Sequence, residues 1–430
     1  MPQESFGNLL VAQTLLSVLQ LLQLLNPHSQ GVTVPQESFL IPGKPRSCPH
    51  KGSATPGLRY AALLALLLFA VAAPSPPQTK SASNTFDSLA QKAAAARDSD
   101  QLDDAVALYK KALALRPKWA EGWWSLGTIE YDRNNYRSAA SAFRQLLPLA
   151  PKNGTAYAML GLCEYELGQN AAALQHLEQA KNLDISVDPQ LRLVLLYHDG
   201  LLLLRANRFQ SAQTSLGALC LDSIPNDDAL NALGLAAFRI SPNAAPPEGS
   251  PGAQIILRVG HAACLTVQKK YDEAHKEYAG LISTYPDYPN IHYVYGKFLA
   301  ESGDVPAAVN EFKQELQRNP RDINSRLEIA ANEYKVDSAA GIPYAEEVVK
   351  INPHIPFAHY LLGLLYLDVD QFQKAIPELE IAQKAFPKDA KVYFALGSAY
   401  ARAGRTQDAA KARAEFARLN QETTGAAAGY

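Results

Sequence analysis

The sequence predicts an all-α fold made of stacked helical hairpins, and two regular spacings carry that prediction. Alanines recur 34 residues apart at Ala105, Ala139 and Ala173. Prolines follow the same period further along the chain, at Pro286, Pro320, Pro353 and Pro387. A self-similar period of about 20–50 residues is typical of repeat architectures. Residues after about 85 therefore form one quasi-one-dimensional array and not several globular domains.

Each repeat contains two predicted helices. The first carries an aromatic residue, then Leu-Gly three residues later, as in Trp123-x-x-Leu126-Gly127. The glycine allows a second helix to approach closely, a small residue on that helix faces it, and a proline ends it. The residues expected to play these structural parts are Leu126, Gly127, Ala139, Phe143, Pro151, Gly161, Ala173, Ala274, Pro286, Ala308, Pro320, Gly363, Ala375, Pro387, Gly397 and Ala409.

These residues resemble the signature of the tetratricopeptide repeat (TPR) family, W-x₂-L-G-x₂-Y…A-x₃-F…P. The resemblance covers roughly residues 86–420 and is closest to exported bacterial members. It implies a right-handed superhelical solenoid of about nine helix-turn-helix units.

The predicted organisation has seven segments. We expect a leader or mis-assigned start at 1–57, a signal peptide at 58–72 and a Pro/Ser-rich linker at 73–85. Units 1–4 then occupy 86–225, and units 5–9 with a C-terminal capping helix occupy 253–420. Between them, 226–252 reads as an orphan helix and a Pro/Gly loop, and 421–430 as a mobile tail. The interruption is either a helix that lost its partner or a kink or contact loop that divides the array.

The segment 58–72 indicates export. Thirteen apolar residues, Ala61–Ala73, follow Arg59, and Ala70-Val71-Ala72 supplies small residues for cleavage after Ala72. This apolar run is short for a membrane span and suits a signal peptide. We expect a periplasmic or secreted protein; the alternative is a membrane anchor formed by the same segment. The unusual residues before it suggest that translation begins later, at Val34 or Leu58.

Composition argues against several classes of function. The 40 basic and 42 acidic residues give a net charge of −2, so no electrostatic footprint for nucleic acid is present. No phosphate-binding loop, nucleophile elbow, zinc-protease motif or dinucleotide fingerprint occurs, so we predict no enzyme, cofactor or metal site. His198 and His359 stand alone and read as packed or surface residues. The pairs Glu130–Tyr131 and Glu164–Tyr165 recur at one repeat position, which indicates scaffold geometry.

The cysteines give a weaker signal. Cys163, Cys220 and Cys264 each lie in an apolar helical pattern, and Cys48 lies in the leader. We expect buried helix-packing thiols, with one disulfide as the alternative.

The family resemblance implies a binding surface on the concave side, at positions 2, 5, 9, 12 and 13 of each first helix. The carboxylate clamp of the chaperone-binding branch is absent, because its positions hold Ala90, Ala94 and Ser125 in the first two units. The helices around 191–204 and 357–367 are apolar nearly all round, so each is either buried on two sides or offers a second face to a ligand. The predicted groove residues are Trp124, Thr128, Tyr131, Leu162, Tyr197, Leu201, Tyr293, Lys297, Tyr360, Leu364, Leu367 and Phe394, with Ala158 and Leu204 beside them.

The function predicted from these observations is a non-enzymatic scaffold that binds a peptide or helical segment of a protein partner outside the cytoplasm. The alternative is a membrane-tethered envelope assembly factor, or a non-catalytic subunit of an envelope-processing enzyme complex. A membrane association is expected only if the signal segment stays uncleaved.

Overall fold

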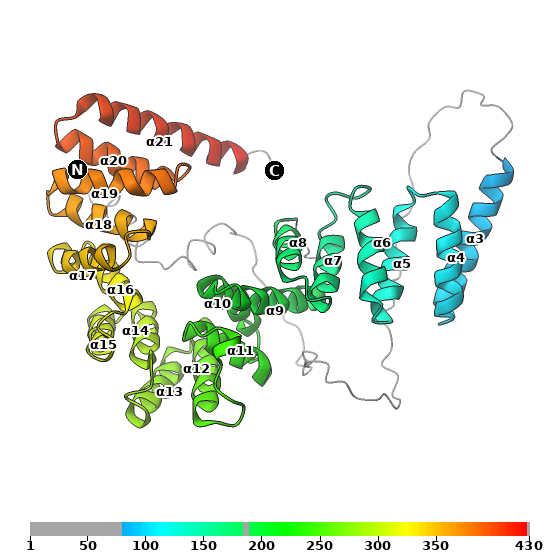
Figure 1. Cartoon of the computed structure of the whole chain (residues 1–430), viewed down its shortest axis with the longest axis horizontal. Coiled ribbons are helices and arrows are strands. Elements are labelled where there is room, and N and C mark those ends of the chain that lie inside the picture. Colours follow the sequence, from blue (N-terminus) through cyan, green and yellow to red (C-terminus); the bar gives the residue numbers. More distant parts are fainter. Residues whose placement is uncertain (1–79, 184–188, 428–430) are drawn as a thin grey trace. The chain divides into compact units, whose positions relative to one another are not determined.

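The computed structural model describes residues 80–183 and 189–427, and these residues form helices joined by short turns, with no strand among them. They fall into two compact units that divide between Leu219 and Cys220 (Figure 1). The predicted leader, signal peptide and most of the linker lie outside the described residues, as does the turn at 184–188.

The N-terminal unit contains four helical pairs. In Figure 1 its first pairs stand side by side as antiparallel hairpins. Its helices are α3 (Lys80–Asp98), α4 (Leu102–Leu115), α5 (Ala120–Asp132), α6 (Tyr136–Leu146), α7 (Gly154–Glu166), α8 (Asn170–Asn182), α9 (Pro189–Arg205) and α10 (Phe209–Gly217), followed by the 3-10 turn η1 (Ala218–Cys220).

The C-terminal unit contains α11 and five further pairs, with the short turn η2 (Pro242–Ala244) after α11. Its helices are α11 (Asp227–Ala237), α12 (Pro251–Val267), α13 (Tyr271–Thr284), α14 (Ile291–Ser302), α15 (Val305–Arg318), α16 (Ile323–Glu333), α17 (Ser338–Ile351), α18 (Pro356–Asp368), α19 (Phe372–Ala385), α20 (Ala390–Arg402) and α21 (Thr406–Ala427).

The glycine and alanine positions pack as the repeat pattern predicts. A Cβ added to Gly127 would lie 2.7 Å from the Phe143 ring, and one added to Gly363 would lie 2.6 Å from Leu379. The alanines on the facing helix are buried because a larger side chain would separate the pair. Ala139, Ala173, Ala274, Ala308 and Ala375 are all fully buried.

The predicted orphan helix is not an orphan. Helix α11 packs along α12, and two glycines bring the backbones into contact. A Cβ on Gly234 would lie 2.0 Å from the carbonyl oxygen of Ile256, and one on Gly260 would lie 1.9 Å from that of Leu230. Helix α12 therefore has two partners, α11 and α13, and the C-terminal unit begins with a three-helix layer. The expectation of one partner for each helix missed this arrangement.

The expectation of free thiols is wrong for two cysteines. Cys220 and Cys264 form a disulfide, with their Cα atoms 5.2 Å apart, while Cys163 remains a buried free thiol. The bridge ties the end of η1 to α12, and the Gln268 side chain donates a hydrogen bond of 2.7 Å to the Cys220 carbonyl beside it. Sequence missed the pair because its partners are 44 residues apart, on elements whose contact depends on the α11–α12 layer.

Both ends of the described array are longer than predicted. Helix α3 begins at Lys80, inside the expected linker, since the prolines of that segment stop at Pro77. Helix α21 continues to Ala427, inside the expected tail, because no proline follows Pro387 and alanine favours the helix.

Candidate functional site

The candidate site is the face shared by the first helix of each pair, which we call helix A. Helix α7 contacts α9 in the N-terminal unit, and α14, α16, α18 and α20 contact one another in turn in the C-terminal unit. Side chains at repeat positions 2, 5, 9 and 12 of these helices therefore form a continuous surface within each unit. We call it the helix-A face.

Four predicted groove residues are buried and offer little surface to a partner. Tyr197 is 9% exposed, and burial raises the pKa of Tyr293 to about 12. Leu162 and Leu364 are buried as well, at 2% and 8% exposure. The remaining eight are half-buried or exposed: Trp124, Thr128, Tyr131, Leu201, Lys297, Tyr360, Leu367 and, at 51% exposure, Phe394.

The two helices that are apolar all round are buried on two sides. In α9, the run Leu202–Leu204 is buried almost completely, and in α18 the run Leu361–Tyr366 is buried as a whole. Both helices contact helix A neighbours as well as their own partners. Their excess of apolar residues is therefore used mainly for packing, and only Leu201, Tyr360 and Leu367 keep part of their surface.

Aromatic side chains form the N-terminal part of the face. The Trp124 ring packs edge-on to Phe143 at 5.7 Å, and Tyr131 packs edge-on to Tyr136 at 5.5 Å. Burial, with the neighbouring Tyr136, raises the pKa of Tyr131 well above its usual range, so this phenol stays neutral. Thr128 bonds its own helix through the carbonyls of Trp124 and Ser125. These three groove side chains carry no charge, although the exposed Glu121 stands at position 2 of the same helix.

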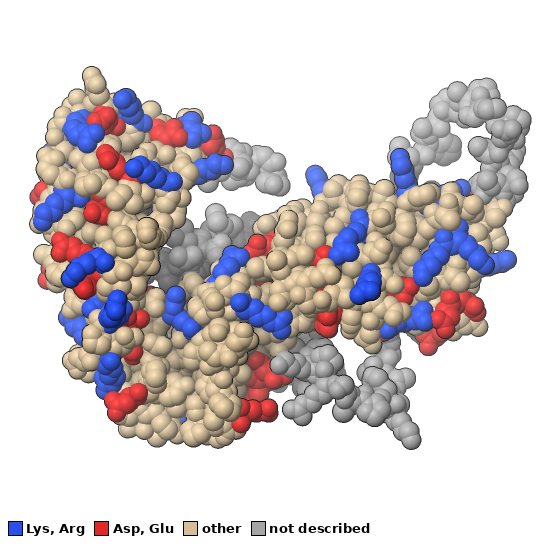
Figure 2. Space-filling view, viewed as in Figure 1, with Lys and Arg blue, Asp and Glu red and all other residues tan. Residues whose placement is uncertain are grey.

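Three basic side chains on or beside the C-terminal part are paired within the chain, whereas the exposed Lys391, at position 2 of α20, has no ion pair among the described residues. The Lys297 ammonium lies 2.8 Å from the Glu328 carboxylate, and this pairing outweighs burial and raises the pKa of Lys297. Lys335 pairs with Asp368, and Arg402 lies 3.1 Å from Asp370. Figure 2 shows both signs of charge intermixed on the viewed side of the molecule, with no large area of one sign.

Sequence reasoning missed several residues of the face. Phe357 stands at position 2 of its repeat and is 48% exposed. Leu327 and Tyr334 on or beside α16 and Tyr165 on α7 are half-buried at positions 5 and 12. The same positional rule would have found them if it had been applied to every repeat, α16 included.

The boundary between two successive repeats is called a repeat joint here. At five of these joints a side chain donates a hydrogen bond to a proline carbonyl. In each case the residue at position 4 of helix A donates to the carbonyl six residues earlier, at the end of the preceding repeat. Five different donors, of four residue types, serve here. The pairs are Trp123 with Pro117, His292 with Pro286, Arg326 with Pro320, His359 with Pro353 and Tyr393 with Pro387, at 2.6–3.0 Å.

A second polar contact joins residues 20 apart across the same joints. In the N-terminal unit a glutamate on helix A accepts a hydrogen bond from a basic side chain on the preceding helix. Lys110 donates to Glu130 at 3.3 Å, and Arg144 donates to Glu164 at 2.8 Å. In the C-terminal unit the polarity is reversed, because a helix-A tyrosine donates to a glutamate. The pairs there are Tyr366 with Glu346, and Tyr400 with Glu380 at 2.7 Å. The glutamates of the recurring Glu-Tyr pairs, Glu130 and Glu164, thus make contacts between successive repeats.

A cavity of about 350 Å³ opens beside the last repeat, on another side of α20 from the helix-A face. Ala412 on α21 stands where the two preceding histidine-containing repeats have Glu311 and Glu378, so no long side chain covers Tyr393. The lining consists of Gln383, Tyr393, Leu396, Tyr400, Asp408, Lys411, Ala412 and Glu415.

The described residues hold no group of three or more His, Cys, Asp or Glu side chains placed to bind a metal ion. Within the same residues, none of the helices combines the length and the apolar character needed to cross a bilayer.

A tetratricopeptide repeat family model matches residues 91–153, 125–186, 267–323 and 360–422, which together cover half of the chain. The chain belongs to the tetratricopeptide repeat family. Proteins of this family are scaffolds for protein–protein interaction, and this TPR protein has the all-α repeat fold that its sequence predicts.

The curated relative matches only part of the chain. Superkiller protein 3 of Schizosaccharomyces pombe is 28% identical over 135 residues, which is 30% of this TPR chain. The chain spans 10% of the length of that relative.

Among solved structures, a MamA fragment from Desulfovibrio magneticus is 24% identical, covers 39% of this chain and 96% of its own, and superposes with a TM-score of 0.37. A tetratricopeptide repeat protein from Parabacteroides merdae is 17% identical, over 66% and 99%, with a TM-score of 0.29. Yeast Tom70 is 15% identical, over 78% and 69%, with a TM-score of 0.31. Such likeness carries no argument about activity.

Proposed function

We propose that this TPR protein is an exported, non-enzymatic scaffold that binds an apolar helical segment of a protein partner along its helix-A face. The half-exposed aromatic residues of that face are the observation that supports the proposal. Aromatic side chains provide large contact areas and are enriched where proteins bind one another. Phe357 and Phe394 are the most exposed of them, at 48% and 51%.

The charge pattern favours an apolar partner over a charged one. Lys297, Lys335 and Arg402 on this face are already paired with carboxylates of the chain. A charged peptide would have to compete with these pairs for its contacts. An amphipathic helix that lays its apolar side on the aromatic residues leaves the pairs in place.

Two observations support export. The segment 58–72 has the composition of a signal peptide. The Cys220–Cys264 disulfide favours an oxidising compartment, since disulfides are rare in the reducing cytosol. A periplasmic or secreted location satisfies both.

Site-specific photo-crosslinking tests the proposed surface. A photo-reactive residue at Phe394, on the helix-A face, should form an adduct with the partner in native extracts. The matched control is Ile381 on α19, which is apolar and 40% exposed but belongs to the second helix of its pair. The double variant Phe357→Glu, Phe394→Glu should abolish capture while far-ultraviolet circular dichroism stays unchanged. Equal adducts from Phe394 and Ile381, or full capture by the double variant, would disprove this surface.

A further inference from the structure

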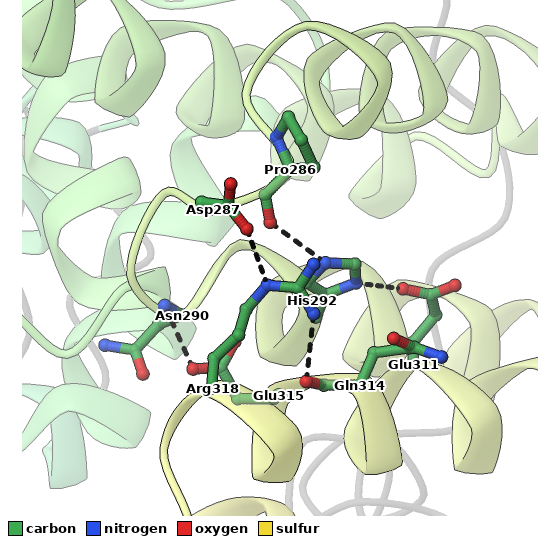
Figure 3. A network of polar contacts seen from close by, with 8 residues as sticks. All are labelled: Pro286, Asp287, Asn290, His292, Glu311, Gln314, Glu315 and Arg318. Atoms are coloured by element: carbon green, nitrogen blue, oxygen red, sulfur yellow. Dashed lines mark hydrogen bonds and ion pairs between the residues drawn. The ribbon is translucent and has the colours of Figure 1, made fainter.

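Two joints of the C-terminal unit contain the same histidine contact. In α14, His292 Nδ1 lies 2.6 Å from Glu311 Oε2 of α15, and its Nε2 lies 3.0 Å from the Pro286 carbonyl oxygen (Figure 3). In α18, His359 Nδ1 lies 2.5 Å from Glu378 Oε2 of α19, and its Nε2 lies 2.9 Å from the Pro353 carbonyl oxygen. Each histidine thus joins its own repeat to the end of the preceding one.

Both ring nitrogens of these histidines face oxygen atoms. A carbonyl oxygen only accepts hydrogen bonds, so Nε2 carries a hydrogen in each case. Nδ1 then faces a carboxylate oxygen, and the contact needs one further proton, either on Nδ1 or on the glutamate. Without it, two lone pairs would oppose each other at 2.5–2.6 Å.

The surroundings leave water little access to the two histidine rings. The side chains of His292 and His359 are 7% and 5% exposed, and those of Glu311 and Glu378 are 16% and 20% exposed. His176 and His261 also pair with glutamates, but their side chains are 24% and 40% exposed. Loss of the shared proton is therefore most costly at His292 and His359, where a ring nitrogen left without its hydrogen bond would stay poorly hydrated.

Other ionisable side chains lie near the His292–Glu311 and His359–Glu378 pairs. Near His292, α15 contributes Glu315, whose pKa is raised by burial, and Arg318, which pairs with Asp287 at the end of the preceding repeat. Asp322, the residue before α16, acts on Glu315 and contributes to raising its pKa. Around His359, Glu378 also acts on Tyr366, which donates to Glu346 of α17. No lysine or arginine is hydrogen-bonded to Glu311 or Glu378 in place of the histidine among the described residues.

We propose that His292–Glu311 and His359–Glu378 are proton-operated clasps, each of which closes a repeat joint only while the pair holds one shared proton. When the proton leaves to solvent, the neutral ring keeps a single N–H and can bond only one of its two acceptors, the glutamate or the proline carbonyl, so the joint loosens. The closed joint therefore holds a proton that the opened joint can release. The protection of each joint against opening accordingly falls as pH rises. The inference rests on the fold and is independent of the proposed partner.

Hydrogen exchange of the full-length protein between pH 5.5 and 8.5 tests the clasps. Mass spectrometry reads peptides from 286–318 and 353–385 separately, after correction for the intrinsic pH dependence of exchange. Protection should fall with rising pH, by up to about tenfold per pH unit for one proton.

A variant with uncharged glutamines in place of the two glutamates tests whether the shared proton causes the pH dependence. In Glu311→Gln, Glu378→Gln, each glutamine amide can donate to the bare Nδ1 of a neutral histidine, so the joints stay closed and the corrected pH dependence should vanish. His354→Gln, at an exposed histidine in the turn before α18, is the matched control and should keep the wild-type dependence. No corrected pH dependence in the wild type, or the same dependence in the double variant, would overturn the proposal.

If the double variant fails to fold, nitrogen-15 NMR spectra of the wild-type protein measure directly which ring nitrogens of the histidines carry a proton. At pH 7 the closed clasps require a proton shared at Nδ1 as well as one on Nε2 of His292 and His359. A ring with a fully bare Nδ1 at both sites would refute the clasps.

Discussion

Glu130 and Glu164 stand where the repeat motif has tyrosine, and both are buried, at 3% and 1% exposure. Each is satisfied by a base reaching from the preceding helix, and Glu164 has a second partner in His176 at 2.6 Å. Burial alone would raise the pKa of Glu164, but the hydrogen bonds from His176 and Arg144 outweigh it and hold that pKa below its usual range. A buried carboxylate is tolerated here because it is fully bonded.

This lowered pKa predicts acid sensitivity of the N-terminal unit. The folded unit keeps Glu164 ionised at a pH where the unfolded chain has already bound a proton. The stabilisation is present above the usual glutamate pKa of about 4.3 and is lost as pH falls through the lower folded value. All three tryptophans, Trp119, Trp123 and Trp124, lie in this unit, so their fluorescence during denaturation reports it alone.

Glu164→Gln should lower the free energy of unfolding at pH 7 by about 2 kcal/mol and weaken the acid dependence. The control is Glu178→Gln, because Glu178 pairs with Arg208 at the surface and is worth less than about 1 kcal/mol. Equal losses in the two variants would contradict the role assigned to Glu164.

Helices α11 and α12 show how a glycine pair sets the distance between elements. Elsewhere the repeat glycine meets the end of a flexible side chain, such as Leu216 opposite Gly200. Gly234 and Gly260 instead meet backbone carbonyl oxygens, which cannot rotate away. The two helices can therefore approach this closely only while both positions lack a Cβ.

Gly260→Ala should separate α11 from α12 and destabilise the C-terminal unit by about 3 kcal/mol. The matched control is Gly280→Ala on α13, where a Cβ would lie 3.9 Å from its nearest neighbour, the Arg258 guanidinium. That change should be neutral or stabilising by up to about 1 kcal/mol, since alanine favours the helix. Hydrogen exchange of peptides from 227–267 and 271–284 measures both variants, and a Gly260→Ala protein as stable as the wild type would disprove the close contact.

At the scale of the whole chain, the repeats form two compact units that use different joint chemistry. In the N-terminal unit, a helix-A glutamate accepts a hydrogen bond from a basic side chain on the preceding helix. In the C-terminal unit, a helix-A tyrosine donates a hydrogen bond to a glutamate on the preceding helix. The disulfide lies at the start of the C-terminal unit, where the regular period is interrupted. It stabilises the α12 layer by about 2–4 kcal/mol in the usual range for such bridges.

Export predicts the covalent state of the natural protein. Intact mass spectrometry of protein purified under thiol-blocking conditions should find a chain that begins at Ala73, with Cys220 and Cys264 joined. Cys163 should stay unblocked until the protein is denatured, because burial raises the pKa of its thiol to about 12. A chain that begins at Met1 or Pro2, with both cysteines reduced, would refute the export proposal.

Sequence alone predicted the repeat, the pairing of successive helices and their close approach at Gly127. Local spacing is enough for these, because the residues involved lie within one repeat of each other. It also indicated which positions face the same side of helix A, although it could not tell that Leu364 is covered and Phe394 is not. Exposure depends on what neighbouring repeats place over a residue.

The contacts that cross from one repeat to another, or interrupt the period, became visible only in the folded molecule. Pairing of Cys220 with Cys264, the second partner of α12, and the proton-dependent contacts of His292 and His359 are of this kind. Each depends on the distance and orientation of groups on different helices, which the one-dimensional period leaves undetermined. A lone histidine in the sequence therefore read as a packed or surface residue, while the fold gave it two acceptors and one proton to share.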